Sequence, residues 1–282
     1  MSDNLRASVP VISVDPDKCV NCHRCIADCP VKYCNNGSEE HVEIDPALCI
    51  GCGNCLSACT HGARTILDDF APAMAALERG EPTVAIVAPS AASCFGSDHL
   101  RVNGWLESLG VAAWFDVSFG AELTVRSYVE HLRRDQPECV IAQPCPAVVN
   151  YIELYRPELI PFLAPVDTPM LHTIKMIRRD YPRYAGHAVL AVSPCAAKAQ
   201  EFRAAGVDVY NVTVSSIRRH FEQAGRSLAD LPAREFHGPQ AGRGVGFSSP
   251  GGLVRTVERE IPGIEVRTRR IEGAPRVYRY LD

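Results

Sequence analysis

The sequence predicts a small α+β unit that is dense in cysteine, followed by a larger α/β domain built on a parallel sheet. Two observations support this prediction. Nine of the 13 cysteines in the 282-residue chain lie between Cys19 and Cys59. The rest of the chain alternates short apolar runs with helical patterns, which is typical of α/β domains. We place the boundary between residues 78 and 79, so the domains are expected at residues 1–78 and 79–282.

Charge and composition exclude several classes of protein. Lys and Arg total 29 against 33 Asp and Glu, so we expect no basic surface for a nucleic acid. Hydrophobic residues make up 46% of the chain and charged residues 22%, which indicates a globular protein. No apolar run approaches the roughly 20 residues that a membrane span needs, and residues 1–10 lack the apolar core of a secretory signal. The default expectation is a cytoplasmic protein without a membrane span.

The cysteine-dense segment contains one spacing twice. Residues 19–30 and residues 49–59 each follow C-x2-C-x2-C-x3-C, the run of bacterial ferredoxins and a highly specific pattern. Three thiolates on a tight loop hold three corners of one 4Fe-4S cube, and the fourth cysteine reaches the other cube. The spacing therefore assigns one cluster to Cys19, Cys22, Cys25 and Cys59, and the other to Cys49, Cys52, Cys55 and Cys29.

The surroundings of these runs agree with a pseudo-symmetric ferredoxin-like domain. Asp15 and Asp45, each followed by proline, stand at the same offset before the two runs, which gives a repeat of 30 residues. A zinc site would favour pairs of C-x2-C, and disulfides are not expected without a secretory signal. The proline after the first run, Pro30, is missing after the second, but proline is not a ligand. Cys34 has no place in either run, and we expect it to be structural or without a role.

The remainder of the chain predicts the α/β domain. Apolar runs at residues 83–88, 139–142 and 187–192 each lead into a proline turn, as buried parallel strands do. The predicted helices are residues 70–80, 98–109, 121–134, 168–180 (capped by Thr168) and 215–224 (capped by Ser215).

Two cysteines follow the carboxyl ends of predicted strands, where α/β domains usually have their binding and active sites. Cys145 and Cys195 each follow a predicted strand and a proline, and free N–H groups of a following helix stabilise a thiolate. This position favours metal ligands over the buried structural role that a lone cysteine usually has. Cys139 falls inside a predicted strand and is expected to be structural, and Cys94 is a weaker ligand candidate. Lys198 could bind an anionic ligand near Cys195, or form a solvated Glu–Lys pair on a helix face.

The order of these pieces resembles the iron-only (FeFe) hydrogenase family, in which a two-cluster ferredoxin segment precedes an α/β catalytic domain. Residues 143–170 and SPCAAKAQE (193–201) resemble its first two cysteine motifs, and VAPS (87–90) and SPGG (249–252) resemble its backbone loops. The active site of that family, the H-cluster, joins a 4Fe-4S cube to a di-iron unit. The resemblance implies that Cys145 and Cys195 ligate the cube, that Lys198 contacts a cyanide of the di-iron unit, and that Pro89 and Ser90 line that unit.

The sequence also departs from the family pattern. Pro144 stands where the standard enzymes have a proton-relaying cysteine, and Ser193 stands where they have methionine. No cysteine follows Cys195, whereas the third motif of the family supplies two further ligands. The chain therefore resembles a divergent, sensory-type member that stops at Asp282, short of that third motif.

Three functional hypotheses follow. The first is a hydrogenase-like oxidoreductase of the H2:ferredoxin type, which oxidises H2 reversibly and passes electrons through two 4Fe-4S clusters. This activity would need a third 4Fe-4S cluster and a di-iron unit. It is therefore conditional on the ligands that the third motif of the family supplies. The second is a non-catalytic electron-transfer module or redox sensor, and the third is an iron–sulfur assembly factor. The expected partner is an electron carrier, such as ferredoxin, or a redox-signalling protein.

Overall fold

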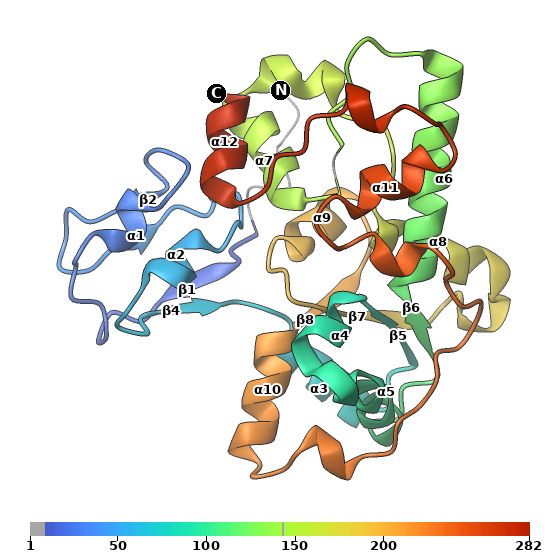
Figure 1. Cartoon of the computed structure of the whole chain (residues 1–282). Coiled ribbons are helices and arrows are strands. Elements are labelled where there is room, and N and C mark those ends of the chain that lie inside the picture. The colour runs from blue at the N-terminus through green and yellow to red at the C-terminus, as the bar shows by residue number, and fades with distance from the viewer. Residues whose placement is uncertain (1–8, 143) are drawn as a thin grey trace.

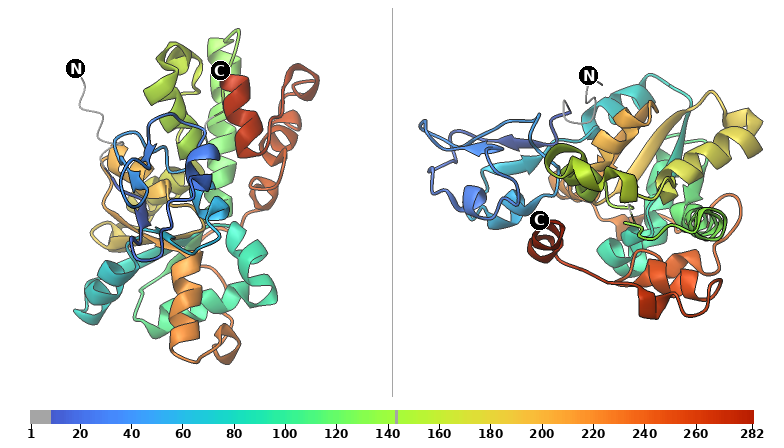
Figure 2. Two further views of the ribbon diagram at one scale, coloured as in Figure 1. Left: turned by 90° about the vertical axis from the view of Figure 1, so that its left-hand side faces the viewer. Right: turned by 90° about the horizontal axis from the view of Figure 1, so that it is seen from above.

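A small lobe stands to one side of a larger α/β part (Figure 1). The computed structural model describes residues 9–142 and 144–282. Residues 1–8, where the sequence predicts no secretory signal, and Gln143, the first residue of one motif, lie outside the described residues. We call residues 9–66 the cysteine-rich lobe. Figure 2 shows the lobe projecting from the side of the molecule in the view from above.

The cysteine-rich lobe is built from two similar halves. Each half has one short helix that follows a residue with positive φ, His23 at 62° and Gly53 at 81°. This left-handed conformation turns the chain between the second and third cysteine of each run. The lobe confirms the predicted α+β unit. Its elements are β1 (Ile12–Val14) paired antiparallel with β4 (Arg64–Ile66), β2 (Asn35–Asn36) paired antiparallel with β3 (Glu43–Ile44), α1 (Arg24–Ala27) and α2 (Asn54–Ala58).

A four-stranded parallel sheet forms the centre of the second part, as predicted. The strands lie in the order β6-β5-β7-β8, and all neighbours run parallel. Every residue of β5 is buried, which explains why its sequence is a continuous apolar run rather than an alternating one. The strands are β5 (Thr83–Val87), β6 (Trp114–Asp116), β7 (Ala188–Ser193) and β8 (Val209–Thr213).

Helices cover both faces of this sheet. One face packs against α3 (Phe70–Glu78), α4 (Ser90–Phe95), α5 (His99–Ser108) and α10 (Val214–Gln223). The other face packs against α6 (Val117–Asp135), α8 (Pro169–Asp180) and α9 (Lys198–Ala204). Three further helices lie outside these layers: α7 (Pro146–Tyr155), α11 (Gly252–Glu258) and α12 (Ala274–Leu281).

The predicted strand at residues 139–142 is wrong. The segment forms only an isolated bridge, in which the Ile141 N–H donates to the Phe162 carbonyl at 2.7 Å. Cys139 is therefore exposed and does not belong to a strand. Strands β6 and β8 were not predicted, since β6 has only three residues and β8 includes Asn211.

Of the two helix caps predicted from the sequence, one is correct and the other is wrong. The cap of α8 is Thr168, as predicted, and its Oγ1 accepts from the Leu171 N–H at 3.5 Å. The cap of α10 is Thr213 rather than Ser215, because the Thr213 Oγ1 accepts from the Ser216 N–H at 3.3 Å.

The link between the two parts is tied to the sheet. Asp68 accepts from the Thr213 N–H and Asp69 from the Asn211 N–H, both at 2.8 Å. Helix α3 follows at once and packs into the sheet core. The domain boundary between residues 78 and 79 stays a prediction. Within the described residues, no helix combines the length and the apolar character needed to cross a membrane.

We expect Gly120→Ala to destabilise the fold. A Cβ at Gly120 would lie 2.1 Å from the Thr173 Oγ1 and 2.2 Å from the Pro169 carbonyl oxygen, and overpacking of this kind costs about 1–3 kcal/mol. Thermal unfolding followed by circular dichroism measures the change. Gly186→Ala is the control, because its Cβ would meet no atom within 4 Å. An unchanged midpoint for Gly120→Ala would contradict the close α6–α8 packing.

Candidate iron–sulfur and sheet-edge site

The eight cysteines of the two runs line two hollows inside the lobe. One hollow is lined by Cys29, Cys49, Cys52 and Cys55. The other is lined by Cys19, Cys22, Cys25 and Cys59. We call these the proximal and the distal cavity, because the loop of Cys49 touches the α/β part. Each cavity takes three cysteines from one run and one from the other, which are the two sets that the spacing assigns.

The four thiols of each cavity are spaced apart and do not converge on one metal-ion position. Among the residues that the structure describes, no three His, Cys, Asp or Glu are grouped closely enough to hold a single metal ion. Backbone donors reach two thiols of the distal cavity. The Val42 N–H donates to the Cys19 Sγ at 3.4 Å. Burial acts to raise the pKa of Cys59, but backbone N–H groups of residues 61–64 outweigh it and lower that pKa. Such donors stabilise a thiolate.

Arg64 provides a test of whether an anionic cluster fits these cavities. Its side chain is only 7% exposed, and its Nη2 donates to the Cys25 Sγ at 2.9 Å. Its Nη1 is buried and has no hydrogen-bond partner among the described residues. A buried cation without a carboxylate is costly, whereas a cubane held by four thiolates carries net negative charge. The donor set and this unpaired nitrogen therefore fit 4Fe-4S clusters in the lobe.

Cys34 is a fifth thiol on the wall of the proximal cavity. It is buried, and its hydrogen bond is the largest cause that lowers the pKa of Cys29, to about 6. The same thiol lowers the pKa of Cys49. Burial raises the pKa of Cys52 to about 12 and that of Cys55 to about 11. The structure thus gives Cys34 contacts at the cavity that the cysteine spacing alone did not predict.

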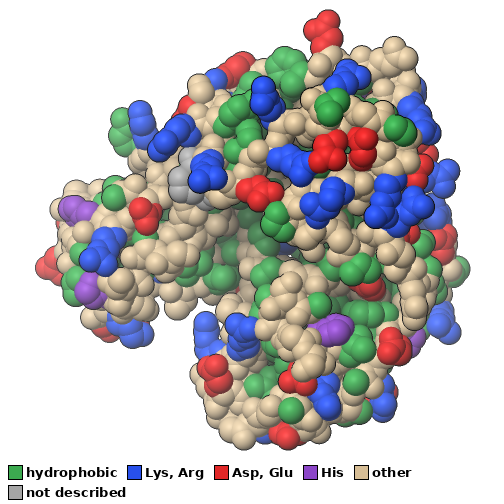
Figure 3. Space-filling model, in the orientation of Figure 1, with side chains coloured by type: hydrophobic (Ala, Val, Ile, Leu, Met, Phe, Trp, Pro, Cys, Tyr) green, Lys and Arg blue, Asp and Glu red, His purple; other side chains and the backbone are tan. Residues whose placement is uncertain are grey.

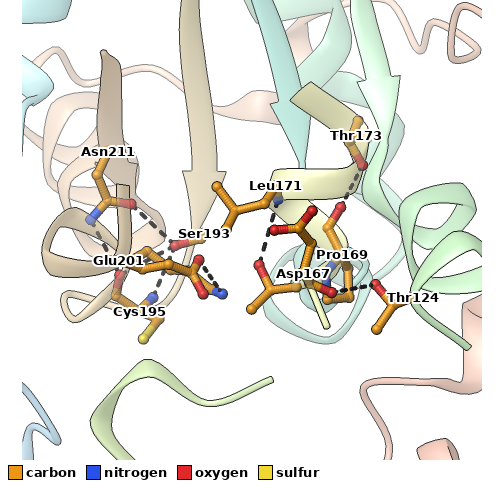
Figure 4. Close-up of polar contacts among 11 residues, drawn as sticks. Thr124, Asp167, Pro169, Leu171, Thr173, Ser193, Cys195, Glu201 and Asn211 are labelled. Carbon is orange, nitrogen blue, oxygen red and sulfur yellow. Dashed lines mark hydrogen bonds and ion pairs between the residues drawn. The ribbon is translucent and has the colours of Figure 1, made fainter. Parts of the chain in front are cut away.

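The turn around Cys195 is fixed by two polar side chains, Ser193 at the end of β7 and Asn211 of the neighbouring β8 (Figure 4). The Cys195 N–H donates to the Ser193 Oγ at 3.2 Å, and the Asn211 Nδ2 donates to the Cys195 carbonyl at 3.2 Å. Both side chains are fully buried. Burial also raises the pKa of Cys195, and the nearby Lys198 opposes that rise. The backbone of Cys195 is therefore held at the carboxyl edge of the sheet.

Cys145 lies near Cys195, although it reaches this place differently than expected. It is the residue before α7 and is exposed, but residues 139–142 are not a strand of the sheet. A charge on Cys145 acts to raise the pKa of Cys195, so the two thiols are within electrostatic reach of each other. The predicted pair of equivalent strand-to-helix turns is thus correct for Cys195 and wrong for Cys145.

The other predicted site residues lie at the same edge. Pro89 and Ser90 follow β5, beside the end of β7; Pro89 is the N-cap of α4 and Ser90 is its first residue. Lys198 is the first residue of α9, and its Nζ lies 2.7 Å from the Glu201 Oε2. The Glu–Lys pair of the alternative interpretation is present, but both side chains are buried rather than solvated. On the other side of Figure 4, Thr124 and Thr173 hydrogen-bond the backbone at Asp167 and Pro169 and so fix the start of α8.

Helices α7 and α9 connect these cysteines to the proximal cavity. The Gln200 Nε2 donates to the Cys49 carbonyl at 3.1 Å, and the Asn150 Nδ2 donates to the Gln200 Oε1 at 2.7 Å and to the Ile50 carbonyl at 3.2 Å. Gln200 is fully buried. At Gly51, a Cβ would lie 2.8 Å from both Ala197 and Gln200 side-chain atoms, so the loop of Cys49 lies directly against α9.

Tyr278 of α12 lies near both the proximal cavity and the two sheet-edge cysteines. It is buried, and its ring centroid lies 4.8 Å from that of Tyr151. Burial raises the pKa of Tyr278, and charges on Cys52, Cys145 and Cys195 add to this effect. The proximal cavity and the two sheet-edge cysteines are therefore within electrostatic reach of one side chain. In the space-filling view the surface is hollowed between the lobe and the lower α/β part (Figure 3).

Arg64, Gln200 and Asn150 are site residues that the sequence patterns did not predict. Arg64 lies 30 residues after Cys34, so the internal repeat offered a signal for both. Gln200 and Asn150 form hydrogen bonds between segments that lie 50 to 151 residues apart in the sequence. A local sequence pattern does not predict such contacts.

Comparison with known proteins finds two families in this chain. Residues 11–60 match the 4Fe-4S dicluster domain, and residues 81–273 match the C-terminal domain of the iron only hydrogenase large subunit. No match was found among curated proteins.

Several solved structures share the fold. One, from a study of oxygen inactivation of FeFe-hydrogenase through its H cluster 2Fe subcluster, has a TM-score of 0.55 at 22% identity and covers 68% of this chain and 58% of its own. HydA(deltaEFG), from a study of stepwise H-cluster assembly, has a TM-score of 0.54 at 21% identity and covers 68% and 56%. A variant of HydA1 from Chlamydomonas reinhardtii has a TM-score of 0.55 at 22% identity and covers 68% and 57%.

At these identities the structural likeness shows the fold alone, and the chain spans less than two thirds of the length of these hydrogenases. The match over residues 81–273 extends through most of the chain and confirms the resemblance drawn from the motifs. With its N-terminal 4Fe-4S dicluster domain, the chain belongs to the iron-only hydrogenase family.

Proposed function

We propose that this protein carries electrons between a redox partner and a hydrogenase-like site at the carboxyl edge of its sheet, through two 4Fe-4S clusters in the lobe. A 4Fe-4S cluster supplies reversible one-electron storage when it is bound. The observation that supports this most is the grouping of two crossed sets of four cysteines around two cavities. The partner we expect is an electron carrier such as a ferredoxin, or a redox-signalling protein.

The ligands follow from these groupings. Cys29, Cys49, Cys52 and Cys55 would hold the proximal cluster, and Cys19, Cys22, Cys25 and Cys59 the distal one. The hydrogen bonds from α9 to the Cys49 carbonyl, and from Asn150 of α7 to the adjacent Ile50 carbonyl, support a proximal cluster that exchanges electrons with the sheet edge.

The reaction proposed at the sheet edge is the reversible oxidation of H2 to protons and electrons. Cys145 and Cys195 would be two ligands of a third 4Fe-4S cube, and such a cube is held by about four protein ligands. No cysteine follows Cys195 in these 282 residues, so the proposed activity is conditional on further ligands and on the di-iron unit. Lys198 would contact a cyanide of that unit, and Pro89 and Ser90 would line it. The buried Glu201 keeps the Lys198 ammonium in place.

A specific observation favours a second candidate, an electron-transfer or redox-sensor function without H2 chemistry. Pro144 stands directly before Cys145, and a proline side chain can neither accept nor donate the proton that the reaction would release at that place. The electron path through the lobe would be the same in both cases.

We expect Cys52→Ala to remove the proximal cluster and Cys22→Ala to remove the distal one, because each takes away one of the ligands that a cubane needs. Iron and acid-labile sulfide would each fall by one cluster in the anaerobically reconstituted protein. Cys139→Ala is the control, since Cys139 is exposed and lines neither cavity. Equal losses in Cys139→Ala, or none in the other two variants, would contradict the ligand sets.

We expect a third cubane signal when the chain is reconstituted with a small external thiol that completes the site at the sheet edge. Electron paramagnetic resonance of the reduced protein would show it, and Cys195→Ala or Cys145→Ala would abolish it while sparing the two lobe clusters. Cys94→Ala is the control. If no more than two cubanes form under these conditions, the catalytic assignment fails and the second candidate replaces it.

A further inference from the structure

One difference between the two halves of the lobe lies at a pair of equivalent positions beside the two cavities. Cys34 lies five residues after Cys29, the fourth cysteine of its run, and Arg64 lies five residues after Cys59. Both side chains point inward, with exposed fractions of 2% and 7%. The repeat thus puts a neutral thiol at one cavity and a permanent cation at the other.

Arg64 forms part of the wall of the distal cavity. It opens β4, where it pairs with Val14 of β1, and this pairing fixes the direction of its side chain. The Nη2 donates to the Cys25 Sγ at 2.9 Å, and the Nη1 is buried without a partner among the described residues. Since the charge of an arginine persists at any ordinary pH, a full positive charge is held against the distal thiols.

Cys34 gives the proximal cavity a weaker partner. Its Sγ donates to the Asp45 carbonyl oxygen at 3.8 Å, and its thiol acts to lower the pKa of Cys29 and of Cys49. A neutral thiol is a weak donor, whereas a charged donor interacts roughly twice as strongly as a neutral one. The charge of Arg64 also acts to lower the pKa of three proximal thiols. It is the smallest of the causes at Cys29 and Cys49, and at Cys55 it is second to burial, which raises that pKa. The hydrogen bond from Arg64 to a thiol, however, goes to the distal cavity.

We propose that Arg64 makes the distal cluster the more easily reduced of the two, so that electrons from the sheet edge collect at the distal end of the lobe. Reduction adds one electron and therefore one negative charge to a cluster that is already anionic. A fixed cation in a buried setting stabilises the reduced form more than the oxidised form, and local charge and hydrogen bonds set such potentials. This inference rests on the two-cluster function proposed above.

The exposure of the distal cavity agrees with this direction. Cys22 is exposed, and Val20, which also lines the cavity, is 61% exposed. The proximal cavity instead lies beside the Cys49 loop, which α9 covers and Gln200 binds. An electron carrier can therefore approach the distal cluster directly. The positive charge of Arg64 would stabilise the reduced form of this cluster, from which the carrier would accept the electron.

The test is a redox titration of the full, anaerobically reconstituted chain, followed by electron paramagnetic resonance. The unmodified protein is expected to show two separate one-electron waves. Arg64→Gln, which keeps a donor but removes the charge, should move the more positive wave to lower potential. We expect at least a tenfold fall in the reduced-to-oxidised ratio at fixed ambient potential, about 59 mV for a one-electron couple. Arg64→Lys should retain most of the original potential.

Arg24→Gln is the matched control. Arg24 lines the same cavity but is exposed, so solvent screens its charge and the same substitution should move the wave much less. Two retained clusters with unchanged waves in Arg64→Gln would overturn the proposal, and so would an equal shift in Arg24→Gln.

A second variant covers the case in which Arg64→Gln fails to retain its clusters. Cys22→Ser changes one ligand of the distal set and should alter the more positive wave. An effect confined to the more negative wave would overturn the proposal. Iron and sulfide analysis of the unmodified protein separates the two ideas. Fewer than two clusters would refute the proposed function, whereas two clusters without an Arg64 effect would refute this inference alone.

Discussion

The crossing of the two cysteine sets is the constraint on which the rest of the structure depends. Because each cavity takes its fourth thiol from the other run, the two loops must face each other. The pairing of β1 with β4 and the left-handed residues His23 and Gly53 provide this arrangement. The same geometry brings the residues that follow each run, Cys34 and Arg64, into the walls of the cavities. A buried cation there is tolerable only beside an anion, which is what a cluster held by four thiolates would supply.

This lobe is attached to the α/β part through the segments that carry the other candidate ligands. Helix α7 follows Cys145 and helix α9 follows Cys195, and both helices bind the loop of Cys49 through Asn150 and Gln200. Because the donors of both side chains are buried and hydrogen-bonded, loss of either side chain would leave its partner group unsatisfied in the interface. The connection between the lobe and the sheet edge is therefore specific rather than a general apolar contact. That connection is the structural basis for an electron path from one to the other.

Much of this could be predicted from the sequence, and the failures have physical reasons. The cysteine spacing assigned the sets that line the two cavities, because ligand spacing is local. Apolar runs predicted β5 and β7 but also a false strand at residues 139–142, since hydrophobicity does not reveal whether a neighbouring strand is available to pair. Strand β6 was too short to detect, and Thr213 rather than Ser215 caps α10 because β8 extends to Thr213. The roles of Arg64 and Gln200 depend on contacts between distant segments, which one sequence does not display.

The most direct measurement of the central claim is a crystal structure of the anaerobically loaded protein with anomalous diffraction at the iron edge. The account predicts two compact iron peaks in the lobe, one inside each cavity, each bonded to three cysteines of one run and one of the other. The proximal peak would contact Cys29, and the distal peak would contact Cys59 and lie beside Arg64. Iron bound by the four cysteines of a single run, or single ions in place of cubes, would contradict it.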